Sequence, residues 1–160
     1  YRELYKKGLL GTELGDMLTN MEMEDPFSVP GVLDTSCWSR TGTTGPTVGE
    51  TLQRAGHKLR RADKNRIQGK IQIHEYLKIK QSGRPRLQIF NTCPNLIREL
   101  QSIPLDKSNP EDVNTHAPDH AYDALRYLIM ARPRINDTMS QMRQLSRERH
   151  FQPVDSTFGY

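Results

Sequence analysis

The sequence predicts an α/β fold in which short, largely parallel strands pack against helices. Short apolar runs alternate along the chain with segments whose apolar residues recur at the helical period. Residues typical of helix starts, helix ends and turns stand at the boundaries between these segments. Strand and helix alternate four times, and one more helix follows, which favours a largely parallel sheet because helices provide the crossover connections between parallel strands.

Four short segments are predicted as strands. They cover residues 1–6, 32–34, 57–61 and 86–90. The second of them ends in Asp34, so a carboxylate would stand at the carboxyl end of a buried strand, where α/β sheets place their ligand sites. Asp also begins turns for ordinary backbone reasons, so the residue type leaves both roles open.

Five helices are predicted from capping residues and apolar periodicity. They run over residues 13–23 and 48–55, from residue 63 or 65 to about 80, from about 94, and from about 118. The last helix has an apolar stripe that is expected to face the core. This stripe consists of Ala121, Ala124, Leu125, Leu128 and Ile129.

The first turn of the last helix carries three polar side chains suited to metal binding or proton transfer. His120 and Asp123 are three residues apart, so they project from neighbouring points of one helix surface, and Asp119 is four residues before Asp123. Acidic residues at a helix start also complement the helix dipole, and a histidine there can simply face water. The spacing alone therefore leaves a catalytic and a purely structural role open.

The charge of the chain permits nucleic-acid binding without showing it. The 160 residues carry a net charge of +4 and have a pI near 9.2. The basic residues gather in two zones, which could follow a phosphate backbone or form a solvated face. The zones are Lys58, Arg60, Arg61, Lys64, Arg66 and Lys70, and Arg132, Arg134, Arg143, Arg147 and Arg149.

Several functional classes find no support in the sequence. Cys37 and Cys93 stand alone, without the paired spacing of a zinc site or a disulfide framework. No apolar run is long enough to span a bilayer, and no signal peptide opens the chain. The glycine-rich segment 42–49 lacks the Gly-Lys-Ser/Thr ending of a phosphate-binding loop, so ATP hydrolysis by this chain alone is not expected.

The segment 133–160 is predicted to be a polar tail. It is rich in Arg, Ser and Gln and has few residues that could fill a core. Met139, Met142 and Leu145 recur every three residues, so a short helix could form there against a partner or against the domain.

Three segments resemble the nuclease domain in the large terminase subunit of tailed bacteriophages. The run 119–127, with the sequence Asp-His-Ala-Tyr-Asp-Ala-Leu-Arg-Tyr, closely resembles the final helix of that domain. The segment 31–36 is similar to the family's middle strand with its metal-binding Asp, here Asp34, and the segment 3–9 is similar to the end of its opening hairpin. The likeness covers about residues 1–132.

The resemblance implies a ribonuclease-H-like mixed sheet flanked by helices, and a metal-dependent endonuclease that cuts concatemeric double-stranded DNA with two Mg²⁺ or Mn²⁺ ions. Asp34 and Asp123 would be metal ligands, because these ions prefer carboxylate oxygens. His120 would bind metal, orient water or move a proton, and Asp119 would either contact the metal ligands or act as a charge at the helix start. The residues chosen for contacts to DNA phosphates are Arg60, Arg61, Lys64, Arg66 and Lys70.

The family's opening strand carries a further metal-binding Asp, and the sequence starts after the point that corresponds to it. The chain is therefore expected to be an N-terminally truncated nuclease domain that cuts DNA weakly or not at all by itself. Glu3 is the nearest possible replacement, although its segment does not correspond to the ligand-bearing strand. A sheet without its first strands would also expose an unpaired edge.

The resemblance further implies partners and a location. These are double-stranded DNA, an amino-terminal ATPase motor domain, the portal, the small terminase subunit and the cytoplasm of a host cell, with no membrane. The alternative function is a non-catalytic remnant of a prophage terminase that binds DNA or docks on the portal. Convergence of Asp34 and Asp123 on one point would favour the enzyme.

Overall fold

The computed structural model describes residues 2–26, 29–40, 45–114 and 116–132, and the statements below concern these residues. They form five α-helices, one 3₁₀ helix and one short parallel sheet. In chain order the elements are α1 (Gly11–Glu22), β1 (Gly31–Leu33), η1 (Thr35–Trp38), α2 (Val48–Arg54), β2 (Leu59–Arg61), α3 (Arg66–Leu77), α4 (Pro94–Ser102) and α5 (His120–Met130). The predicted tail, 133–160, lies outside the described residues.

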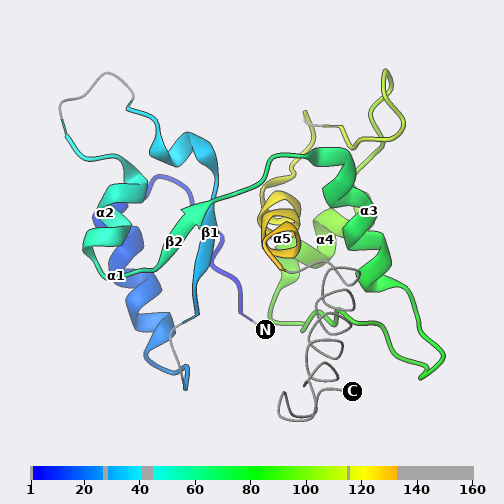
Figure 1. The fold of residues 1–160 in the computed structure, drawn as a ribbon, viewed down its shortest axis with the longest axis horizontal. Coiled ribbons are helices and arrows are strands. Elements are labelled where there is room, and N and C mark those ends of the chain that lie inside the picture. The colour runs from blue at the N-terminus through cyan, green and yellow to red at the C-terminus, as the bar shows by residue number, and fades with distance from the viewer. Residues whose placement is uncertain (1, 27–28, 41–44, 115, 133–160) are drawn as a thin grey trace, which may run out of the picture.

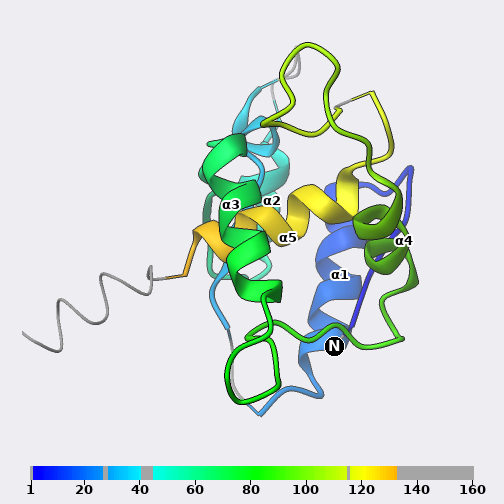
Figure 2. The same ribbon diagram turned by 90° about the vertical axis from the view of Figure 1, so that its right-hand side faces the viewer.

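The elements form two groups that meet at the sheet. Figure 1 shows α1, α2 and the two strands on one side and α3, α4 and α5 on the other, with the connection from β2 to α3 crossing between them. α5 packs against α3, against α4 and against β1, so it touches both groups. The view at 90° shows α5 running crosswise past α3 (Figure 2). α5 is therefore the central element of the fold.

The helix boundaries follow from local chemistry, as the sequence predicted. The Asn65 side chain accepts a hydrogen bond from the Gln68 N–H at 3.0 Å and caps α3, which confirms one of the two predicted starts. α2 is capped by Thr47 and is followed by Gly56, whose φ of +99° lies in the left-handed region that glycine tolerates. Pro94 occupies the first turn of α4.

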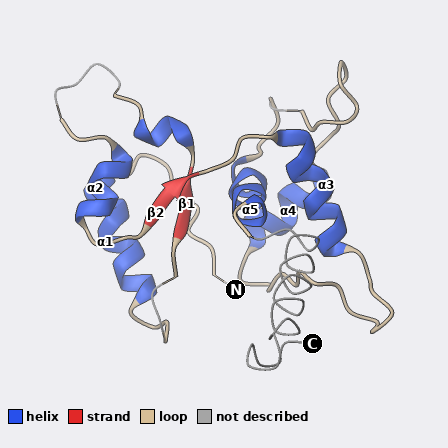
Figure 3. Ribbon diagram, viewed as in Figure 1, coloured by secondary structure: helices blue, strands red, loops and turns tan. Residues whose placement is uncertain are grey.

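The sheet consists of β1 and β2 in parallel register, and it is short (Figure 3). Gly31 is opposite Leu59, and Leu33 is opposite Arg61. Gly31 permits this approach, because a Cβ built on it would lie 2.8 Å from Leu59 Cδ2. The prediction of strands at 32–34 and 57–61 is thus confirmed, and Asp34 directly follows the carboxyl end of β1.

The two other predicted strands are wrong. Segment 86–90 alternates between half-buried and exposed side chains, as a strand would, but it forms no ladder. Its Leu87 N–H donates instead to the Tyr76 carbonyl at 2.9 Å, at the end of α3. Segment 2–6 is not a strand either, and its Glu3 and Tyr5 side chains contact α4. An alternating pattern reports which side chains face the core, whereas a strand also needs a neighbour to pair with.

The main hydrophobic core lies between α3, α5 and the loop that precedes α5. Its buried members are Ile73, Val113, Tyr122, Leu125 and Ile129. The predicted apolar stripe of α5 is correct for Leu125 and Ile129, whereas Ala124 and Leu128 are exposed. No helix in the described parts of the chain has the length and apolar character that a bilayer crossing requires.

α3 and α5 approach most closely at Gly69. A Cβ on Gly69 would lie 2.4 Å from Arg126 Cγ and 2.7 Å from its Cδ. The Arg126 side chain cannot swing aside easily, because it is buried and bonded to Asp123. The absence of a side chain at residue 69 therefore sets the distance between the two helices.

We expect Gly69→Ala to lower the free energy of unfolding by about 1 to 3 kcal/mol, because the overpacking outweighs the higher helix propensity of Ala. Urea denaturation measures this change. Gly15→Ala is the matched control, because a Cβ there meets only ordinary contacts, 3.4 Å from Ala55 Cβ and 3.5 Å from Leu52 Cδ2. That variant should be as stable as the parent or more stable, and equal behaviour of the two variants would contradict the packing argument.

Candidate functional site

The amino terminus of α5 is held by a buried carboxylate from α4. Glu99 is 1% exposed, and its Oε2 accepts hydrogen bonds from the N–H groups of Ala121 at 2.7 Å and Tyr122 at 3.0 Å. These N–H groups belong to the first turn of α5, where no intrahelical acceptor exists and the helix dipole favours a negative charge. Asp119, at the capping position itself, makes no side-chain cap. Glu99 therefore takes the capping role.

A second carboxylate does the same for α4. Glu3 Oε2 accepts from the Leu96 N–H at 3.0 Å, and Glu3 Oε1 accepts from the Asn95 N–H at 3.3 Å and from the Asn95 amide. Tyr5 then donates its hydroxyl to Glu99 Oε1 at 3.1 Å. Segment 2–6 thus holds the start of α4 through Glu3, and α4 holds the start of α5 through Glu99. This role for Glu3 is structural, and none of its contacts joins it to Asp34 or Asp123.

Asp34 lies where the end of β1 meets α5. The Tyr127 hydroxyl donates a hydrogen bond to Asp34 Oδ2, and Asp34 Oδ1 accepts from the Ser36 N–H at 2.6 Å. Lys64 Nζ is 3.4 Å from Asp34 Oδ1. The bond from Ser36 is the ordinary backbone role of an Asp that begins a turn, here the cap of η1. The bond from Tyr127, distant in sequence, is what brings the strand carboxylate to α5.

These contacts keep Asp34 ionised. Burial acts against its charge, but the hydrogen bonds from Tyr127 and Ser36 and the charge of Lys64 outweigh burial and hold the pKa of Asp34 well below its usual range. Burial and the bond to Asp34 raise the pKa of the Tyr127 hydroxyl. The Tyr127 hydroxyl therefore stays protonated and donates its hydrogen bond to Asp34 across the neutral pH range.

Asp123 stands one turn before Tyr127 on α5 and is paired with two guanidinium groups. Its Oδ1 accepts from Arg126 Nε and lies near Arg126 Nη2, both at 3.0 Å, and its Oδ2 is 3.7 Å from Arg66 Nη1. The Arg126 guanidinium also lies 4.5 Å from the Tyr127 ring centroid. Asp123 and Asp34 are thus linked through adjacent residues of α5.

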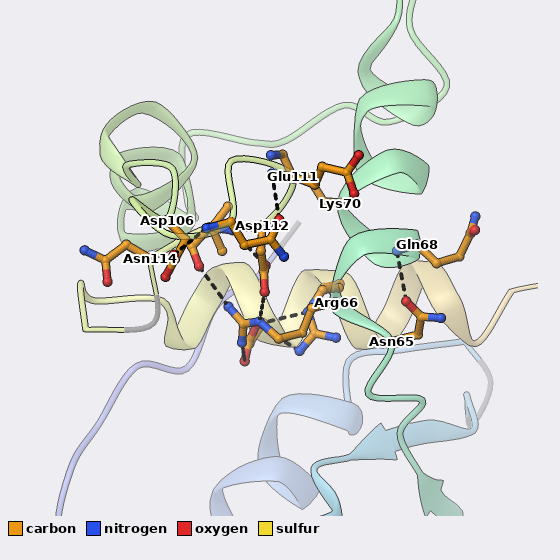
Figure 4. A network of polar contacts seen from close by, with 12 residues as sticks. Asn65, Arg66, Gln68, Lys70, Asp106, Glu111, Asp112 and Asn114 are labelled. Atoms are coloured by element: carbon orange, nitrogen blue, oxygen red, sulfur yellow. Dashed lines mark hydrogen bonds and ion pairs between the residues drawn. The ribbon is translucent and has the colours of Figure 1, made fainter.

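The connection from β2 to α3 supplies a cation to each carboxylate. Lys64 pairs with Asp34, and Arg66, two residues later, pairs with Asp123. Arg66 also donates its Nε to Asp112 Oδ2 at 2.9 Å. Figure 4 shows Arg66 extended across α5 toward the loop that carries Asp106 and Asp112. Lys64 and Arg66, chosen from the sequence for contacts to DNA, are therefore counterions of the candidate ligands.

The other residues chosen for DNA contacts also have partners within the chain. Arg60 Nη2 donates to the Ala131 carbonyl at 2.5 Å, and Lys70 Nζ donates to the Pro110 carbonyl at 3.2 Å. The Arg61 guanidinium lies 5.4 Å from the centroid of the Trp38 ring. These five basic residues come from β2, the following connection and α3, so they occupy one continuous part of the chain beside α5.

His120 and Asp119 lie at the start of α5, one turn before Asp123. His120 is exposed and lines a groove with Leu4, Leu96 and Leu128; its Nδ1 is 3.8 Å from Asp119 Oδ1. Burial and the nearby negative charge of Asp123 raise the pKa of Asp119, although Arg66 and His120 act in the opposite direction. The direct contacts at Asp34 and Asp123 do not include His120 or Asp119.

Within the described segments, no three or more His, Cys, Asp or Glu side chains gather closely enough to hold a metal ion among themselves. Comparison of the chain with protein-family models, with curated proteins and with solved structures found no match. The assignment of a function therefore rests on the geometry of the site and on the chemistry of its residues.

Sequence reasoning missed three residues that build this site. Glu99, Arg126 and Tyr127 were not singled out, although the last two belong to the segment 119–127. Burial of Arg126 and Glu99 shows only in three dimensions, since charged residues at these positions are usually solvated. For Tyr127, the one available signal was its spacing of four residues from Asp123, which puts both on neighbouring turns of one helix.

We expect Glu99→Ala to destabilise the protein by about 2 to 4 kcal/mol, because it leaves buried N–H groups of α5 without an acceptor. Glu99→Gln keeps one oxygen acceptor and should cost less. Thermal and urea unfolding measure both changes. Arg98→Ala is the control: it removes only an exposed side chain that lies 3.9 Å from Glu99 Oε1, and it leaves the hydrogen bonds from α5 to Glu99 Oε2 in place. An equal effect of the Arg98 and Glu99 substitutions would contradict the capping role.

We expect Tyr127→Phe to cost about 1 to 2 kcal/mol of unfolding free energy near pH 7, the usual contribution of a hydrogen bond to a charged group. The folded-state pKa of Asp34 is depressed, so its stabilisation is complete above the unfolded value of 3.8 and is lost as the pH falls through the folded pKa. The unfolded state is the same in both proteins, so the difference between them in urea denaturation should be complete near pH 7 and shrink only as the pH falls through the depressed folded-state pKa of Asp34. Equal stability of the two proteins near pH 7 would contradict this contact.

Proposed function

We propose that this chain is a divalent-metal-dependent DNA endonuclease domain of the kind found in phage packaging terminases, with a ribonuclease-H-like arrangement around β1 and α5. The observation that carries the proposal is the hydrogen bond from Tyr127 to Asp34. It brings the carboxylate at the end of a parallel strand to the helix that carries Asp123 one turn earlier. Carboxylates from separate elements at the carboxyl edge of a sheet are typical of two-metal nuclease sites.

The donor chemistry fits Mg²⁺ or Mn²⁺. Mg²⁺ is usually held by one or two carboxylates, with water and substrate phosphate oxygens completing its coordination. Asp34 and Asp123 supply such oxygens, and their side chains are 28% and 20% exposed, so water can reach both. A second ion would need more donors than the described residues bring to Asp34 and Asp123.

A bound divalent ion would supply an activated water and stabilise the leaving oxygen of the cleaved phosphodiester. The residues of the chain would hold and orient the groups around it. Tyr127 fixes the direction of the Asp34 carboxylate, and Glu99 fixes the start of α5 and with it Asp123. The cationic side chains beside the carboxylates would contact the phosphates of double-stranded DNA.

A specific observation also favours a second candidate, the non-catalytic DNA-binding or portal-docking module. Each carboxylate oxygen of Asp34 and Asp123 already has a partner within the chain, from Tyr127, Ser36, Lys64, Arg126 or Arg66. A metal ion at these carboxylates would compete with the cations that now neutralise them. The two candidates therefore differ in whether these ion pairs open.

The nuclease proposal includes the wider assembly that the sequence resemblance implies. In it, the domain would act beside an ATPase motor domain, with the portal and the small terminase subunit as further partners, in the cytoplasm of an infected host cell. His120 would remain a candidate to orient water or move a proton, since it is exposed at the start of the helix that carries Asp123.

We expect the chain to nick supercoiled plasmid DNA at most weakly in Mn²⁺ and not in EDTA, and Asp34→Asn and Asp123→Asn each to abolish this nicking through loss of a metal ligand. Asp16→Asn, an exposed acid on α1, is the matched control and should leave the rate unchanged. Circular dichroism checks that the variants are folded.

Nicking that persists in both Asp34→Asn and Asp123→Asn would contradict the assignment of these two residues as metal ligands. DNA binding without any Mn²⁺-dependent nicking in the parent would favour the non-catalytic module. Mn²⁺ binding measured by electron paramagnetic resonance adds a readout that does not depend on turnover.

A further inference from the structure

Lys64 differs from the other cations around the two carboxylates. Its side chain is 54% exposed, and its one described side-chain contact is the ion pair with Asp34 Oδ1 at 3.4 Å. It lies in the connection between β2 and α3. A long, exposed lysine in such a pair gains little from it, because water screens the charges and the side chain loses freedom.

The two arginines near Asp123 are held much more firmly. The Arg126 side chain is 2% exposed, and it makes two contacts to Asp123 and packs against Gly69. Arg66 is bonded to Asp112 as well as paired with Asp123, and its Nη2 donates to the Val113 carbonyl at 3.4 Å. Their guanidinium groups would stay in place if one contact were lost. Lys64 is the cation that can leave its carboxylate at low cost.

We propose that Lys64 is an exchangeable counterion, which leaves Asp34 when a divalent cation binds there and then contacts a DNA phosphate. This inference rests on the proposed function, because it concerns the same carboxylate and the same nucleic acid. It adds a coupling that the proposed function does not contain: the negative charge of Asp34 masks a DNA-binding cation until a metal ion neutralises it.

The coupling has two consequences of opposite sign. Removing the charge of Asp34 frees Lys64 without any metal, so DNA affinity in EDTA should rise. Removing the charge of Lys64 takes away a competitor of the divalent cation, so cation affinity at Asp34 should rise as well. Both effects follow from one ion pair, because Lys64 competes with the divalent cation for Asp34 and Asp34 competes with DNA for Lys64. If Lys64 were an ordinary surface lysine, the substitutions at Asp34 and Lys64 would change DNA affinity and cation affinity no more than the control substitutions do.

The first arm of the test measures binding of a fluorescein-labelled duplex by anisotropy in EDTA. We expect Asp34→Asn to bind about two- to fivefold more tightly than the parent, the range of a surface ion pair, with a steeper salt dependence by about one phosphate contact. Adding Lys64→Gln to Asp34→Asn should abolish the gain. Asp16→Asn removes the same charge from α1 and corrects for the general rise in net charge.

The second arm measures Mn²⁺ binding by electron paramagnetic resonance. Lys64→Gln should bind Mn²⁺ about two- to fivefold more tightly than the parent, because a competing cation is gone. Lys58→Gln is its control: Lys58 precedes β2, at the strand end opposite to Lys64. Asp34→Asn should lose this Mn²⁺ site in either background.

The inference is overturned if Asp34→Asn binds DNA no better than Asp16→Asn, or if Lys64→Gln and Lys58→Gln bind Mn²⁺ alike. It stands if both arms give the expected shifts, even when no plasmid nicking is found, in which case the nuclease proposal alone fails. Robust nicking that depends on Asp34, together with unchanged binding in both arms, would leave the nuclease proposal intact and remove the exchange.

Discussion

The architecture depends on the capture of the α5 amino terminus by the buried carboxylate of Glu99. An unpaired charge at 1% exposure would be costly, but here it accepts hydrogen bonds from two N–H groups that have no acceptor in their own helix. Glu3 repeats this arrangement one step earlier, at the start of α4. Glu3 thus caps the start of α4, and Glu99, on α4, caps the start of α5. Their positions fix where α5 starts, and so where each of its side chains lies.

The fixed position of α5 places the residues of the candidate site. Its Asp123, Arg126 and Tyr127 follow one another within about one turn, so they share one region of the helix. Arg126 lies over the bare backbone of Gly69 on α3, and Tyr127 reaches the end of β1. The short sheet alone could not bring Asp34 into contact with a helix far along the chain. The packing of α5 against both groups of elements does so, and a shift of this helix would separate Tyr127 from Asp34.

The charges of the site are balanced within the chain, and this balance decides what the site can do. Asp123 is paired with two arginines that have further contacts, whereas Asp34 accepts hydrogen bonds from a hydroxyl and a backbone N–H and pairs with an exposed lysine. Lys64 and Arg66, two of the cations that the sequence suggested for DNA, instead pair with acidic side chains of the chain itself. In the proposed exchange, a metal ion competes with Lys64 for Asp34, and a DNA phosphate competes with Asp34 for Lys64. The proposed nuclease activity and the proposed exchange of Lys64 are two consequences of that shared electrostatics.

The sequence by itself determined what is local: the bounds of the helices to within a few residues, the strand before Asp34 and its partner strand, and the polar start of α5. These follow from capping residues, glycines and apolar spacing, which act over a few neighbouring residues. It failed at 86–90, where the alternation of Leu87 and Ile89 is real but no strand lies alongside. Only the tertiary structure decided that Glu99 caps α5 and that Tyr127 meets Asp34. Burial and pairing of charged groups depend on which distant segments pack together, and no single stretch of sequence carries that information.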